Sequence, residues 1–205
     1  MPVSHSPAPV IHRQLSTLIA LLAFGLLCGI GGLVPSAGAQ APDPAVRYMD
    51  GVTRELIAAS RTHSPATLQS VIMRHADLGY MGGQGLGEYS SQLSAAEKPA
   101  FLSGMARWMA RYATGEAAKY QISHVTFQPA ARPAKYGLMV DSTIHLRDGT
   151  TYDVSWLLNR TGSTFKVRDA QVLSFWMTGQ LNRLFASYIS ENGGQAKALV
   201  IALNR

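Results

Sequence analysis

The chain has 205 residues, of which 47% are hydrophobic, and it carries a formal net charge of +6 at pH 7. This length suits one domain, or one domain with a small helical addition. The sequence has no basic run with interleaved aromatic residues, so it gives no support to nucleic-acid binding, and the positive charge suits an anionic membrane surface equally well.

The beginning of the chain has the organisation of an export signal. An apolar run without charged residues covers 15–34 and follows Arg13. At about 20 residues it is long enough to span a membrane as an uncleaved anchor. Residues 37–39, Ala-Gly-Ala, have the small-x-small form of a cleavage site. We therefore expect residues 1–39 to be a cleaved signal peptide and residues 40–205 to form a single exported domain.

The only cysteine, Cys28, lies inside this leader. The mature domain would then have no disulfide and no free thiol. An exported domain without disulfides has to be stabilised by a hydrophobic core.

Two helices with similar start signals are expected at the beginning of the domain. Asp43 and Ser64 each stand directly before a proline. A capping side chain followed by proline at the first helical position is typical of a helix start. These signals predict helices over about 44–61 and 65–75.

A glycine-rich segment and a strongly patterned helix follow. Glycine weakens a helix by about 1 kcal/mol relative to alanine, so we expect only a short, irregular helix within 77–93. Ser94 and Glu97 form a capping box, which starts a helix expected to reach about Tyr120. Its apolar residues have the spacing i, i+4, i+7, i+8 and i+11, which places them on one helix face. They are Phe101, Met105, Trp108, Met109 and Tyr112.

From about residue 121 the apolar period changes to two, which is typical of strands. We expect four antiparallel strands within 121–173, because the connections are too short for crossovers, with Asp148-Gly149 as a hairpin turn. In the second and third strands the apolar residues stand at alternate positions and share one face. These residues are Leu138, Val140, Ile144 and Leu146 in the second strand, and Tyr152, Val154, Trp156 and Leu158 in the third.

Helices are expected again at about 176–204. The first of them repeats the earlier apolar spacing with Met177, Leu181, Leu184, Phe185 and Tyr188. The order of elements predicts an α+β fold in which a curved, four-stranded antiparallel sheet packs against a helical subdomain. We expect an apolar cavity between the concave sheet face and the helices at 97–119 and 176–190.

Phe175, Trp176 and Met177 stand in a row where the last strand meets the helix. Consecutive helical residues diverge by about 100°, so the three side chains cannot all face one core. At least one of them should meet solvent, a partner or a cargo.

Three segments resemble the MlaC family of periplasmic phospholipid-binding proteins, also called the toluene-tolerance family. They are GEYSSQLSAAEKPAFLSGMARWMARYA, YDVSWLLNRTGSTFKVRDAQV and GQLNRLFASYISENGGQAKALVIALN. The similarity covers nearly all of residues 44–205. Two departures stand out: the family's usual Trp before Lys-Val is Phe165 here, and its Glu-Gly-Val-Ser is replaced by residues 173–177.

This resemblance implies a lipid carrier that is neither an enzyme nor dependent on a cofactor. Such a protein is periplasmic, shields phospholipid acyl chains, and exchanges lipid between an inner-membrane ABC transporter complex and an outer-membrane lipoprotein complex, which maintains outer-membrane lipid asymmetry. The lipid-binding residues we expect are Phe101, Met105, Trp108, Met109, Tyr112, Leu138, Val140, Val154, Trp156, Phe175, Trp176, Met177, Leu181 and Phe185.

Other interpretations remain open. The helical stripes are also what an ordinary core requires. A hopanoid carrier of the HpnM-like branch, an envelope adaptor, or a small curved-sheet enzyme using His124 or His145 with Asp141 or Asp153 would fit the same order of elements. The alternation places His145 and Asp141 on a polar strand face, which favours solvated surface. The histidines show no metal-ligand spacing, and we expect Asp169, on an otherwise apolar strand, to accept structural hydrogen bonds.

Overall fold

The computed structural model describes residues 43–116 and 119–205; the expected signal peptide lies outside these residues. The helices are α2 (Pro44–Arg61), α3 (Pro65–His75), α4 (Leu78–Leu86), the 3-10 helix η1 (Gly87–Gln92), α5 (Lys98–Glu116), α6 (Met177–Glu191) and α7 (Ala196–Leu203). The strands are β1 (Ile122–Phe127), β2 (Arg132–Ala134), β3 (Gly137–Leu146), β4 (Thr151–Thr161), β5 (Thr164–Val172) and β6 (Phe175–Trp176).

The first helices begin where the capping residues predict. The Asp43 carboxylate accepts a hydrogen bond from the Ala45 backbone N–H at 2.7 Å, and its other oxygen accepts one from the Ala131 N–H at 3.2 Å. Ser64 Oγ accepts from the Thr67 N–H. Before α5, Glu97 accepts from the Ser94 N–H at 3.0 Å, as a capping box requires. Apart from the bond to Ala131, which lies between β1 and β2, these contacts satisfy N–H groups that a helix leaves unpaired at its start.

The sheet is antiparallel and has the strand order β1-β3-β4-β5-β6, with β2 pairing beside β1 on the edge of β3. The register places Val140 opposite Trp156 and Ile144 opposite Tyr152, so the apolar residues of β3 and β4 share one face, which confirms the predicted alternation. The four expected strands are present. β2 and β6 were not expected, because three and two residues are too short to show a period.

A β-bulge interrupts β5. Leu157 pairs with Asp169 while Leu158 pairs with Val167, so Arg168 is the extra residue. A bulge re-aims the side chains of the bulged strand. On β3, the first residue has to be glycine. A Cβ on Gly137 would lie 1.9 Å from the Leu158 carbonyl oxygen of the neighbouring strand β4.

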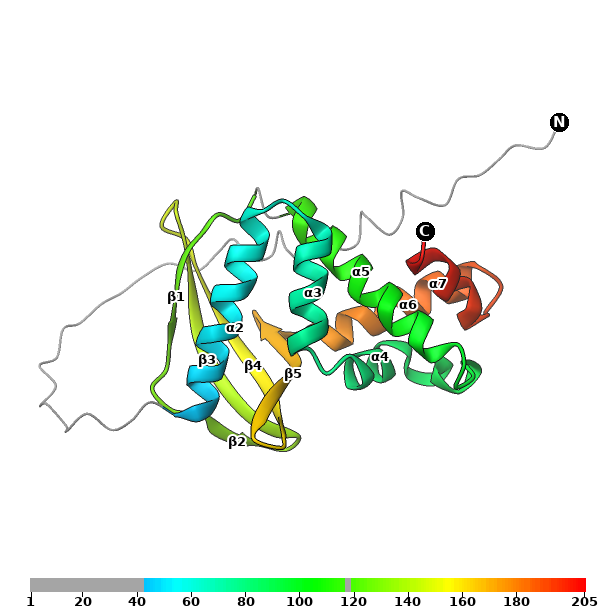
Figure 1. Ribbon diagram of the computed structural model, residues 1–205. Helices are drawn as coiled ribbons and strands as arrows, with labels where there is room; N and C mark the ends of the chain where they lie inside the picture. Colours follow the sequence, from blue (N-terminus) through cyan, green and yellow to red (C-terminus); the bar gives the residue numbers. More distant parts are fainter. Residues whose placement is uncertain (1–42, 117–118) are drawn as a thin grey trace, which may run out of the picture.

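Figure 1 shows the arrangement of the layers. Helix α2 lies across one face of the sheet, while α4, α5, α6 and α7 gather beside the sheet as a helical subdomain. One hydrophobic core runs through both parts and includes Met49 of α2, Phe101 and Met105 of α5, and Phe185 of α6. The fold is therefore the expected α+β arrangement, with α2 as the helix that covers the sheet.

Candidate functional site

An apolar cavity of about 340 Å³ lies between α2 and the concave face of the sheet. Helix α2 contributes Leu56 and Ile57, and the strands contribute Val125, Ile144 and Val154 among others. The end of α5 closes one side with Ala113 and Glu116. The volume lies in the range of small-molecule sites, and the lining is almost entirely apolar.

The few polar side chains of the lining are held by neighbours or stay neutral. Trp156 donates its indole N–H to Ser142 Oγ at 2.9 Å, and that hydroxyl donates to the Val154 carbonyl. The indole thus presents its ring to the cavity with its polar atom already paired. Glu116 binds the Lys119 ammonium at 2.9 Å. Burial raises the pKa of the Tyr120 phenol, which keeps that group uncharged.

Of the expected lipid-binding residues, the structure places Val154 and Trp156 in this cavity. Phe101, Met105 and Val140 are buried in the core and do not line it. Leu181 and Phe185 of α6 lie in the same core, where the Phe185 ring meets that of Phe101 edge to face with 6.0 Å between centroids. The expected position of the cavity therefore needs a correction: α6 does not contribute to it, and α5 contributes only its last turn.

The remaining residues of the α5 stripe are packing residues. Trp108 stacks on Tyr112 with 5.9 Å between ring centroids and contacts Phe185 edge to face. Met109 is partly buried against the core, as are Leu138 and Met177. The reason is that α5 packs on α3 and α7 rather than on the sheet, so its apolar face meets other helices.

The Tyr112 hydroxyl is buried and has no hydrogen-bond partner among the described residues. Burial, and then the nearby Glu116 charge, raise the pKa of this phenol to about 12. An unpaired buried polar group costs about 1–3 kcal/mol. We therefore expect Tyr112→Phe to leave the free energy of unfolding unchanged or to raise it by about 1 kcal/mol, measured by chemical denaturation. A loss of stability above about 1 kcal/mol would show that the hydroxyl has a partner.

The consecutive residues Phe175, Trp176 and Met177 have different environments, as expected, but not because of a shared helix: Phe175 and Trp176 form β6, and α6 begins at Met177. Phe175 is exposed, Trp176 lines a second hollow, and Met177 packs against the core. The turn before them, Leu173-Ser174, has positive φ at both residues, a conformation that non-glycine residues adopt at an energetic cost.

The expected lipid-binding residues included none from α2, although this helix contributes a wall of the cavity. Leu56 and Ile57 line the cavity, yet the sequence indicated only that α2 begins at a cap. The apolar face of α2, with the buried Met49 and Val52, was the signal available. Nothing in the sequence alone says that this face, rather than that of α5, meets the sheet.

The polar face of the sheet has the character expected of surface. His124 and His145 stack with 4.2 Å between ring centroids, Thr143 donates to Asp153 at 2.7 Å, and Arg132 pairs with Asp141. Among residues 43–116 and 119–205, no group of three or more His, Cys, Asp and Glu side chains is arranged to hold a metal ion.

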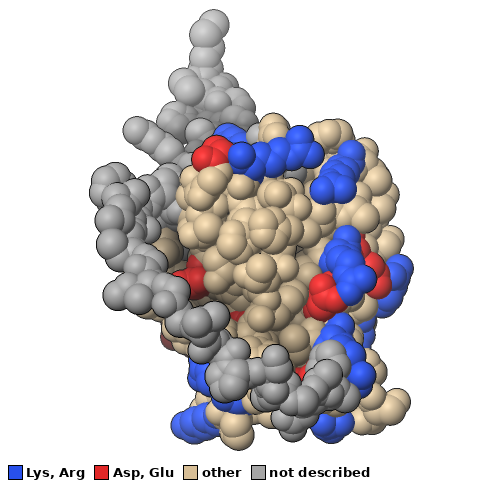
Figure 2. Space-filling model, turned by 90° about the vertical axis from the view of Figure 1, so that its left-hand side faces the viewer, with Lys and Arg blue, Asp and Glu red and all other residues tan. Residues whose placement is uncertain are grey.

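Figure 2 views the molecule from the side on which β1 lies in Figure 1. Lys and Arg side chains lie mainly toward the margins of this side, several of them next to acidic groups, and its centre carries few charged groups. Within the described residues, this side therefore has no continuous basic stripe of the kind that tracks a nucleic-acid backbone.

Asp169 accepts structural hydrogen bonds, as expected. It is 4% exposed. Its carboxylate accepts from the Thr178 backbone N–H at 3.0 Å, from the Thr178 hydroxyl and from the Ala170 N–H. Asp169, a residue of β5, thus caps the first turn of α6. The residue at the N-cap position of α6 is Trp176, and its side chain makes no capping bond. Burial raises the pKa of Asp169, and the bonds from Thr178 partly oppose this.

No helix in the described part of the chain combines the length and the apolar character needed to cross a membrane.

Comparisons with known proteins agree with this architecture. A search of curated proteins finds no match. Among solved structures, the fold is similar to that of the phospholipid-binding protein from Ralstonia solanacearum in complex with a phospholipid, with a TM-score of 0.65 and 19% identity. That likeness covers 78% of this chain and 94% of the other. The family model described as MlaC protein matches residues 53–205, and the chain therefore belongs to the MlaC family.

Proposed function

We propose that this protein is a periplasmic lipid carrier that holds the acyl chains of a phospholipid in the cavity between α2 and the concave sheet face. The observation that carries the proposal is the cavity itself: about 340 Å³ of space with an almost wholly apolar lining. Each buried methylene contributes roughly 0.8 kcal/mol, so a lipid tail would leave a membrane for such a cavity far more readily than for water.

The binding residues in this proposal are those that line the cavity. Leu56 and Ile57 contact the tail from α2, and Val154 and Trp156 contact it from β4. The hydroxyl groups of Thr53, Ser60, Tyr120 and Tyr152 are polar groups of the lining that could bond a headgroup or a glycerol oxygen. Family membership and the phospholipid held by the similar Ralstonia protein both support this assignment.

The wider role we propose follows from the same assignment. The protein is exported with the help of residues 1–39 as a signal peptide. It then exchanges lipid between an inner-membrane ABC transporter complex and an outer-membrane lipoprotein complex, and so maintains lipid asymmetry. The proposed role requires no catalysis. The residues considered for an acid–base site, His124, His145, Asp141 and Asp153, lie on the sheet face opposite the cavity and so would not meet a lipid bound there.

The proposal is tested by purifying the protein without detergent, extracting it with organic solvent and identifying lipids by mass spectrometry. We expect about one phospholipid per protein. A hopanoid in place of phospholipid would change the cargo while keeping the carrier role. An extract without lipid after gentle purification would favour an adaptor whose apolar surface binds a partner protein.

A further inference from the structure

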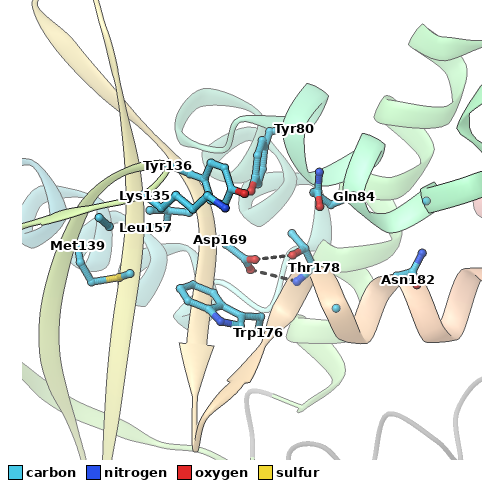
Figure 3. A pocket seen from close by; sticks show the side chains of 13 residues that line it. Tyr80, Gln84, Lys135, Tyr136, Met139, Leu157, Asp169, Trp176, Thr178 and Asn182 are labelled. Carbon is cyan, nitrogen blue, oxygen red and sulfur yellow. Dashed lines mark hydrogen bonds between the residues drawn. The ribbon is translucent and has the colours of Figure 1, made fainter.

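A second and larger hollow, of about 670 Å³, lies on the opposite face of the same sheet. Its walls come from α4, from the connection between β2 and β3, and from the start of α6, and its floor includes Met139 and Leu157 (Figure 3). Leu157 faces this hollow, while its neighbour Trp156 lines the apolar cavity. The sheet therefore separates two sites of different chemistry.

Hydrogen-bond donors converge on one side of this hollow. Figure 3 shows the hydroxyl ends of Tyr80 and Tyr136 close together, with the ammonium of Lys135 beside them. Burial, and then the nearby Asp169, raise the pKa of the Tyr80 phenol, so this hydroxyl remains protonated and can donate. Within residues 43–116 and 119–205, Lys135 has no carboxylate within ion-pair distance.

The wall that carries these donors is fixed by Arg168, the extra residue of the β5 bulge. Its guanidinium donates to the Tyr136 carbonyl at 3.0 Å and to the Asp77 carboxylate at 3.1 Å, and it lies 4.9 Å from the centre of the Tyr80 ring. One side chain thus holds α4 and the β2–β3 connection at a set separation. A site held in this way loses little conformational freedom when a ligand binds.

The opposite wall is fixed by the next residue, Asp169. By capping α6 through Thr178, it sets the position of Trp176 and Gly179, which both line the hollow. Its oxygens are occupied by these bonds and almost fully buried. Asp77 is paired with Arg168. Among the described side chains that line this hollow, the cation without an acidic partner is therefore Lys135.

We propose that this hollow is a second ligand site, which binds a phosphate-type anion through Lys135, Tyr80 and Tyr136. A lysine ammonium binds phosphate oxygens as a point charge, and the two hydroxyls supply directed hydrogen bonds. An apolar part of the ligand would lie on Met139, Leu157 and the Trp176 ring. The site is separate from the cavity proposed to hold acyl chains, and it does not depend on that assignment.

The phosphate group could belong to a lipid headgroup or to a free phosphate compound, and the probes distinguish the two. Inorganic phosphate, glycerol 3-phosphate and dihexanoyl phosphatidylglycerol below its micelle concentration are titrated into the purified protein by calorimetry and by NMR. We expect saturable binding that weakens with ionic strength. Binding of the first two probes indicates a free phosphate compound, and binding of the short-chain lipid alone indicates a headgroup.

Variants decide whether the site is the one described. Lys135→Met should weaken binding at least tenfold, whereas Lys98→Met, which removes an exposed lysine of α5, should leave it unchanged. Each titration is repeated in an Ile57→Trp background, in which the apolar cavity is filled, so that lipid bound there is not counted. Equal binding by Lys135→Met and the parent protein, or no binding of any of the three probes, would overturn the proposal. Either result would leave the acyl-chain cavity untouched.

Discussion

Ile57→Trp is expected to remove most of the phospholipid that purifies with the protein. Ile57 is half-buried and lines the apolar cavity from the C-terminal part of α2. A tryptophan there would extend into the space of about 340 Å³ that the acyl chains need. Because that space already exists, the change should alter the free energy of unfolding by less than the ~1–3 kcal/mol that overpacking a filled core costs. Lipid per protein is measured by mass spectrometry, and stability by denaturation of delipidated samples.

Ile201→Trp is the matched control, since Ile201 is 49% exposed on α7 and far from the cavity lining. It should keep its lipid. If Ile57→Trp retained one phospholipid per protein with an unchanged melting temperature, the lipid would have to be bound elsewhere. If it lost lipid only because it unfolded, the region between α2 and the sheet would be packed rather than open.

Asp169→Ala is expected to lower the free energy of unfolding by about 2–4 kcal/mol, because it removes a helix cap and leaves buried donors without an acceptor. The donors are the Thr178 N–H, the Thr178 hydroxyl and the Ala170 N–H. Asp148→Ala is the control: Asp148 is exposed and accepts from the Thr150 N–H in a hairpin turn, so its loss should cost less than 1 kcal/mol, about the net value of one such bond. A small effect at both positions would contradict the capping role.

Asp169 is also expected to make the free energy of unfolding depend on pH. Burial raises the pKa of Asp169 above its ordinary value of 3.8, so the folded protein holds this proton more tightly than the unfolded chain. This tighter proton binding contributes to the free energy of unfolding. The contribution is fully present below about pH 3.8 and is lost as pH rises through the raised pKa of Asp169. The side chain of Asp169→Asn does not titrate. The stability difference, parent minus Asp169→Asn, should therefore fall as pH rises over this interval, and a difference that rose would contradict the direction of the shift.

The parts of the fold that depend on local interactions could be predicted from the sequence. Asp43, Ser64 and the pair Ser94–Glu97 mark helix starts because their side chains bond backbone groups only two or three residues away. Alternation in β3 and β4 predicted which residues share a face, since a strand directs successive side chains to opposite sides.

Which helix covers which surface could not be predicted, because it depends on contacts between distant segments. Helices α2, α5 and α6 each have an apolar face, yet only α2 lies across the cavity. The Arg168 bulge has no local signal either: it appears when the register of β5 against β4 is known. Alternation in the sequence thus indicated the β4 residues that line the cavity, Val154 and Trp156. The helix that faces them is α2, whereas the sequence pattern had suggested α5 and α6.

The outer edge of β3 is divided between two short strands. Residues 128–131 separate β1 from β2, Pro129 lies in that gap, and Pro133 removes a backbone donor within β2. At the other edge β6 has only two residues. Long open edges allow strands of separate molecules to join, and short, proline-containing edges prevent this. The edge formed by β1 and β2 and the two-residue β6 therefore offer little continuous backbone through which copies of the protein could polymerise.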